Sequence, residues 1–131
     1  MNDPRFLSLD EVLRLHTYQI ENFGGAEGIL EIGLLESAIA MPRQGFGGSY
    51  FHPDLASMAA AYLFHIISNH AFQDGNKRTG VHAALAFLGM NGVDLVLPTD
   101  EGERIALAVA RHEMQKDAVI EFFTQLLKPK D

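Results

Sequence analysis

Residues 55–90 read LASMAAAYLFHIISNHAFQDGNKRTGVHAALAFLGM, and this stretch decides the fold. From Leu55 to Ile67, apolar residues recur at intervals of three and four, and alanines extend the apolar surface around the helix. The segment from Lys77 to Met90 follows the same pattern. A helix that is apolar on nearly every side is a buried one. The sequence therefore predicts two buried central helices joined by a short polar connection.

Helix signals also lie on both sides of this stretch. Ser8 to Glu11 reads as a capping box that opens a helix ending near Gly24, and a second helix is predicted over 31–40 and stopped by Pro42. The residues predicted to face inward from the second helix are Leu34, Leu35, Ala38 and Ile39. Between this helix and the central pair lies a glycine-rich connection, for which a plain linking loop is the simpler interpretation, although long loops are often functional.

The remaining elements are predicted from local signals. Pro53 suits the first turn of the first central helix. Residues 93–97 fit a short extended piece, and Thr99 is predicted to cap a helix that runs to about Arg111. A last helix is predicted to end before Pro129. The expected fold is all-α, a bundle of about six helices in one domain over residues 1–131, with a possible short extended flap.

Composition limits the function classes. The chain has 131 residues, no cysteine and a formal net charge of −7. Disulfides, thiolate zinc sites and cysteine nucleophiles are therefore excluded, and the acidic balance argues against direct binding to nucleic acid or anionic membranes. The N-terminal residues are polar and lack the apolar region of a signal peptide, so a cytoplasmic protein is expected.

The connection between the central helices, residues 70–80, reads HAFQDGNKRTG. Lys77 and Arg78 are the only Lys or Arg residues between Gln44 and Glu103, and they lie where a helix begins, which favours anions. Asp74 is a candidate magnesium ligand, and His70 is a candidate general base. Each residue alone also fits ordinary turn or capping chemistry. Their occurrence together between two buried helices favours a phosphate-handling site.

Residues 70–78 resemble the H-x-F-x-[DN]-[AG]-N-K-R signature of the death-on-curing (Doc) toxins, within the wider Fic superfamily. The resemblance covers nearly the whole chain. It implies a type II toxin–antitoxin system in which the toxin uses Mg²⁺ and a nucleoside triphosphate such as ATP. Its implied partners are a Phd-like antitoxin and a protein substrate, the elongation factor that delivers aminoacyl-tRNA.

The resemblance also assigns roles to residues. His70 would deprotonate a target hydroxyl, Phe72 would anchor the loop and Asp74 would bind magnesium. The residues implied to hold the nucleotide phosphates are Gly75, Asn76, Lys77 and Arg78. The loop from residue 45 to 53 resembles a flap that clamps a target segment as an added strand, with Phe46, Gly47, Gly48, Ser49 and Tyr50 as its binding residues.

Departures from the wider Fic pattern favour one reaction. AMP-transferring members usually carry glycine where this chain has Lys77, and often a second arginine where it has Val81. Both differences resemble the Doc branch, so transfer of the terminal phosphate to a Ser or Thr hydroxyl is predicted. The alternatives are AMP transfer to a protein hydroxyl and a catalytically silent interaction module, against which the intact motif argues.

Two further features are interpreted as structural. The other histidines, of which His65 and His82 lie near the motif in sequence, are expected to pack or to lie on the surface; they are His16, His52, His65, His82 and His112. The segment around Glu21 matches a degenerate inhibitory pattern of some Fic proteins by chance, because its partner arginine is absent and the segment belongs to the first helix.

Overall fold

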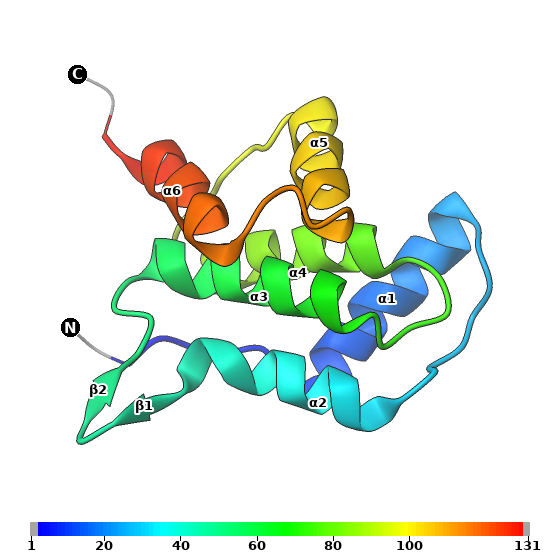
Figure 1. Ribbon diagram of the computed structural model, residues 1–131, viewed down its shortest axis with the longest axis horizontal. Helices are drawn as coiled ribbons and strands as arrows, with labels where there is room; N and C mark the ends of the chain where they lie inside the picture. The colour runs from blue at the N-terminus through cyan, green and yellow to red at the C-terminus, as the bar shows by residue number, and fades with distance from the viewer. Residues whose placement is uncertain (1–2, 130–131) are drawn as a thin grey trace.

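The computed structural model describes residues 3–129, and Figure 1 shows their arrangement. These residues form six α-helices, one turn of 3₁₀ helix and a two-stranded hairpin. In chain order the elements are α1 (Leu9–Phe23), α2 (Ile32–Ala40), a 3₁₀ turn (Met41–Arg43), β1 (Gly45–Phe46), β2 (Ser49–Tyr50), α3 (Leu55–Asn69), α4 (Asn76–Met90), α5 (Thr99–Ala110) and α6 (Lys116–Leu127). The predicted all-α fold with about six helices is confirmed. The predicted domain, 1–131, includes residues 1, 2, 130 and 131, which lie outside the described residues.

Helix α3 forms the centre of the bundle and packs against α4, α6, α2 and α5. The predicted burial of the central pair is confirmed, since most of α3 and half of α4 are buried. Gly80 lets the two helices approach closely, because a Cβ atom there would lie 2.8 Å from Cγ1 of Ile67. This close packing fixes the separation of the two helix ends that carry the 70–80 connection.

Two helix starts follow from local side-chain chemistry. Ser8 and Glu11 form the predicted capping box of α1, with each side chain bonded to the other's main-chain N–H. Asp54 caps α3 in the same reciprocal way with Ser57. Pro53 therefore lies just outside the helix, and its predicted place in the first turn is wrong, because the carboxylate of the next residue takes the cap position.

Two other local predictions are wrong. Leu34 is 38% exposed, because the inner face of α2 is already filled by Leu35, Ala38 and Ile39. Thr99 is the first residue of α5, whose cap position is held by Pro98 without a side-chain hydrogen bond. Residues 93–97, predicted as a short extended piece, belong to none of the described helices or strands.

The glycine-rich connection forms a short hairpin, as the predicted extended flap requires. β1 and β2 pair antiparallel, with Gly45 opposite Tyr50 and Phe46 opposite Ser49. The hairpin lies at the N-terminal end of α3 (Figure 1). The described residues hold no helix that is both long enough and apolar enough to cross a membrane.

Candidate functional site

The loop between α3 and α4 is fixed by Asn76, the first residue of α4. Its side-chain oxygen accepts a hydrogen bond from the Phe72 N–H at 3.1 Å, and its amide nitrogen donates to the Phe72 carbonyl at 2.9 Å. Both residues are buried. The Asn76 side chain thus binds the loop's own backbone, so its main-chain N–H in the unpaired first turn of α4 is the group left for a ligand.

A second anchor comes from α1, and it was missed at the level of sequence. The ring of His16 stacks on the ring of Phe72, with the two centroids 3.7 Å apart and an angle of 5° between the planes. Nε2 of His16 lies 2.7 Å from the Asp74 carbonyl oxygen. A carbonyl only accepts, so this nitrogen donates. The expectation that His16 packs is fulfilled, but its position on the inner face of α1 gave no sign that it would hold this loop.

The third anchor is a strand-like contact with the segment before α2. Phe72 pairs with Ile29 in an isolated antiparallel bridge, and the Leu30 N–H donates to the Ala71 carbonyl at 2.8 Å. The Gln73 N–H donates to the Gly28 carbonyl at 3.1 Å. The loop is therefore bound to α1, α4 and the connection before α2.

His70 ends α3 in a left-handed conformation, with φ 50° and ψ 52°. A non-glycine residue rarely adopts this conformation, which costs about 1–2 kcal/mol. The turn leaves the imidazole exposed while the next two residues are buried. The His70 side chain is therefore accessible from solvent, on a backbone that the anchors hold in place.

Asp74 and the two cations follow within one turn. One carboxylate oxygen of Asp74, Oδ2, accepts a hydrogen bond from the Ala26 N–H at 2.8 Å, and the side chain is exposed. Lys77 and Arg78 are exposed at the start of α4. The Arg78 guanidinium lies over the ring of Phe23, 5.1 Å from its centroid, which orients this cation.

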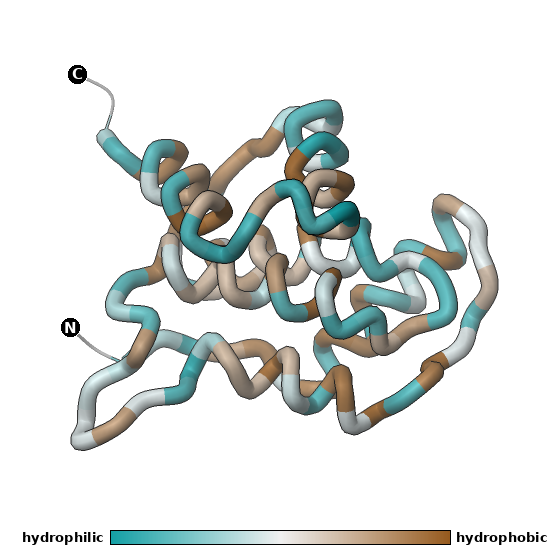
Figure 2. Tube along the Cα trace, in the orientation of Figure 1, coloured by the Kyte–Doolittle hydropathy of each residue, from teal (hydrophilic) through white to brown (hydrophobic). Residues whose placement is uncertain are grey.

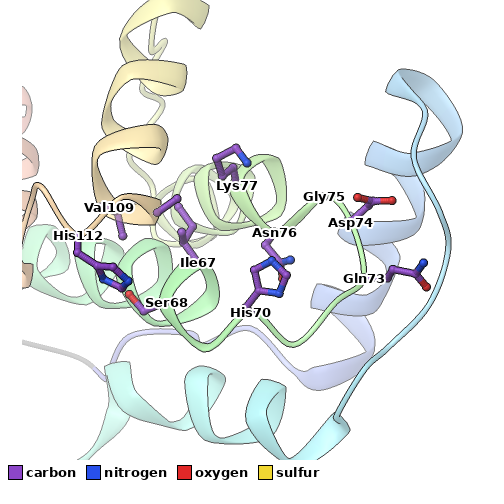
Figure 3. A pocket seen from close by; sticks show the side chains of 11 residues that line it. Ile67, Ser68, His70, Gln73, Asp74, Gly75, Asn76, Lys77, Val109 and His112 are labelled. Carbon is purple, nitrogen blue, oxygen red and sulfur yellow. The ribbon is translucent and has the colours of Figure 1, made fainter.

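Two clefts meet at this loop. The first, of about 350 Å³, is lined by His70, Asp74, Lys77 and residues at the end of α5, and Figure 3 shows its side chains. The second, of about 900 Å³, runs from the end of α1 along α4 to α5 and includes Arg78 and Val81. Asp74, Gly75 and Lys77 line both clefts, so these three residues form the boundary between them.

The Fic/DOC family model matches residues 6–88, which include α1 to α3, the whole loop and all but the last two residues of α4. The chain belongs to the Fic/DOC family. It is 38% identical over 99 residues to Toxin Doc of Mycolicibacterium smegmatis, a match covering 74% of this chain and 76% of that protein. It is 30% identical over 122 residues to Protein kinase doc of Escherichia phage P1, covering 93% of this chain and 95% of that protein.

In this Fic/DOC chain the hairpin lies away from the loop between α3 and α4. It precedes α3, whereas His70 ends that helix, and 15 helical residues span about 22 Å. None of the five predicted flap residues lines either cleft. A target segment that bound Phe46 or Tyr50 and also reached His70 would have to follow the length of α3.

The remaining histidines have different surroundings. His82 lines the second cleft, where burial lowers its pKa. His52 and His65 lie 3.2 Å and 3.0 Å from the Lys116 Nζ, away from the loop. His112 lines the first cleft together with His70, and its distance in sequence from the motif hid this placement.

Proposed function

We propose that this chain is a Doc-type toxin that transfers the terminal phosphate of ATP to a Ser or Thr hydroxyl of a translation protein. One observation carries this proposal: His70, Asp74 and Lys77 line a single cleft beside the N-terminus of α4. That set supplies a base, a carboxylate and a cation for phosphoryl transfer. The names of the two relatives, one a toxin and one a protein kinase, support the same function.

The nucleotide phosphates would bind at the start of α4. The first N–H groups of a helix lack intrahelical partners and attract anions, and Gly75 has φ 82°, which favours glycine at this cap. Lys77 and Arg78 add positive charge in an otherwise acidic chain. In this arrangement Asn76 contributes its main-chain N–H, because its side chain holds Phe72.

Asp74 fits a magnesium ligand. Its Oδ2 accepts the Ala26 N–H, which holds the exposed carboxylate beside the connection after α1, and Asp74 lines both clefts. The described residues contain no group of three or more His, Cys, Asp and Glu side chains suited to a metal. A single carboxylate together with phosphates and water is a common environment for Mg²⁺, which would supply charge neutralisation of the phosphates.

His70 would act as the general base. It accepts the proton of the target hydroxyl, and the hydroxyl oxygen forms a bond to the terminal phosphorus. The bond between that phosphorus and the bridging oxygen breaks, and the nucleoside diphosphate leaves. The fixed loop positions the reactants and neutralises charge, which is most of what this reaction asks of a protein.

Lys77 favours terminal phosphate transfer over AMP transfer. Its side chain lies at the boundary of the two clefts, where the glycine of AMP-transferring members would leave open space. Val81, and not a second arginine, lines the second cleft. These two residues match the Doc branch in charge and shape.

The proposed partners are a Phd-like antitoxin and, as substrate, the elongation factor that delivers aminoacyl-tRNA. The test is to incubate the purified chain with that factor, Mg²⁺ and ATP, and to measure the mass of the factor. The expected result is the addition of one phosphate group on a Ser or Thr residue. Addition of an AMP group, or no addition, would refute the proposed reaction.

Growth provides the matched test in cells. Expression of the chain should arrest growth, and the arrest should disappear with His70→Ala. Glu21→Gln is the control, because Glu21 is exposed on α1 and lines neither cleft. Stronger arrest with Glu21→Gln than with the unchanged chain would show that the segment around Glu21 is inhibitory, which this proposal denies.

A further inference from the structure

Two histidines share an unusual backbone conformation and one cavity. Among residues 3–129, His70 and His112 are the non-glycine residues with positive φ, at 50° and 61°. Both line the first cleft, which His70 enters from the end of α3 and His112 from the end of α5 (Figure 3). Residues held in such strained conformations cluster at functional sites. The second strained histidine therefore needs an explanation.

The backbone around His112 does not explain the choice of histidine. The Glu113 N–H donates to the Ala108 carbonyl at 2.8 Å, and the His112 N–H donates to the Val109 carbonyl at 3.1 Å. These two bonds form a Schellman motif, whose left-handed position is usually glycine. Glycine at 112 would make the same turn without the cost of about 1–2 kcal/mol that a side chain adds there.

Packing does not explain it either. His112 is exposed, so its ring contributes little to the hydrophobic core. The connection from α5 to α6 that carries it is a hydrophilic stretch, as Figure 2 shows. The side chain instead lies in a cleft with a lysine, an aspartate and the start of α4. Because neither the backbone nor the core requires a histidine here, a contact between its side chain and a ligand bound in that cleft is the remaining explanation.

We propose that His112 is a nucleotide-binding residue, whose imidazole donates a hydrogen bond to a phosphate oxygen of the nucleotide held beside Lys77. The inference rests on the proposed function and deepens it, since the family motif ends well before α5. A phosphate group offers several acceptor oxygens, and an imidazole ring carries an N–H group that donates. His112 thus lines the first cleft from a segment that lies far from the motif in sequence, and its imidazole N–H complements the bound anion.

The test compares two substitutions of His112 that both suit the left-handed backbone but differ in whether a side-chain hydrogen-bond donor remains. His112→Gly removes the imidazole and relieves the left-handed strain, so the thermal midpoint should stay equal or rise. Titration calorimetry with Mg²⁺ and a non-hydrolysable ATP analogue should show binding weakened roughly tenfold. His112→Asn keeps a hydrogen-bond donor and tolerates the left-handed conformation, so it should retain more of the affinity than His112→Gly. Arg111→Ala is the control, because Arg111 is an exposed cation of the same turn that does not line the cleft.

The outcomes separate this inference from the proposed reaction. If His112→Gly binds the analogue as tightly as the unchanged chain, or is weakened no more than Arg111→Ala, the inference is wrong even where phosphate transfer is observed. If it raises only the KM for the protein target, His112 binds the target and the inference is also wrong. If the variant weakens analogue binding in a chain that transfers no phosphate to the elongation factor, the inference stands and the proposed reaction fails.

Discussion

Replacing Asn76 with alanine should release the loop that carries His70 and Asp74. The Asn76 side chain satisfies both main-chain groups of Phe72, through bonds of 3.1 Å and 2.9 Å. The neighbouring bridge bonds use Ala71 and Gln73 and not Phe72, whose side chain is 0% exposed. The substitution therefore strands a donor and an acceptor in the interior.

Each of the two stranded groups costs about 1–3 kcal/mol, so Asn76→Ala should lower the free energy of unfolding by about 2–6 kcal/mol. Urea denaturation measures this as a lower midpoint at an unchanged slope. Asn69→Ala is the matched control, because Asn69 donates one exposed hydrogen bond to the Leu34 carbonyl, worth about 1 kcal/mol or less. Equal losses for the two variants would refute the idea that Asn76 fixes the loop.

Three further predictions concern packing, pH and charge. Gly80→Ala should lower the free energy of unfolding by about 1–3 kcal/mol, because its Cβ would lie 2.8 Å from Ile67. Gly89→Ala, whose Cβ would have nothing within 4 Å, should raise it by about 0.5–1 kcal/mol. Urea denaturation of the two variants compares these effects, and equal effects would contradict the close approach of α3 and α4 at Gly80. Burial and Lys116 lower the pKa of His65 from 6.5 to about 4, so the unfolded chain binds more protons between these values and stability should fall as pH falls through that window. His65→Gln should reduce the total loss of unfolding free energy across this window by about 1 kcal/mol after solvent screening, and an unchanged pH dependence would count against this role of His65. Asp74→Asn keeps an acceptor for the Ala26 N–H, so the melting temperature should hardly change while phosphate transfer falls on the order of a hundredfold; a variant as active as the unchanged chain would remove Asp74 from the metal role.

Much of the fold is visible in the sequence because its signals are local. The capping box of α1 and the apolar faces of α3 and α4 each depend on residues within a few positions, and the structure confirms them. The errors arise where the position of a residue depends on which other residues fill a helix face or cap a helix. Leu34 is exposed because other residues fill the inner face of α2, and Pro53 lies outside α3 because Asp54 is the better cap.

The site likewise contains some residues that the sequence brings together and others that only the fold brings together. The motif places His70, Asp74 and Lys77 within eight residues, so their meeting in one cleft follows from proximity in sequence. The groups that build the site around them come from far along the chain. His16 lies 58 residues from Asp74, and His112 lies in the turn after α5. Only the packing of α1 and α5 against α4 reveals that these two histidines belong to the site.

The central claim is that His70 promotes transfer of the terminal phosphate of ATP to a protein hydroxyl. It is tested most directly by incubating the chain and the elongation factor with Mg²⁺ and ATP labelled at either the α or the γ phosphate. The expected result is label on the elongation factor from the γ position alone, and no label with His70→Ala. Label retained from the α position, or undiminished transfer by His70→Ala, would contradict the claim.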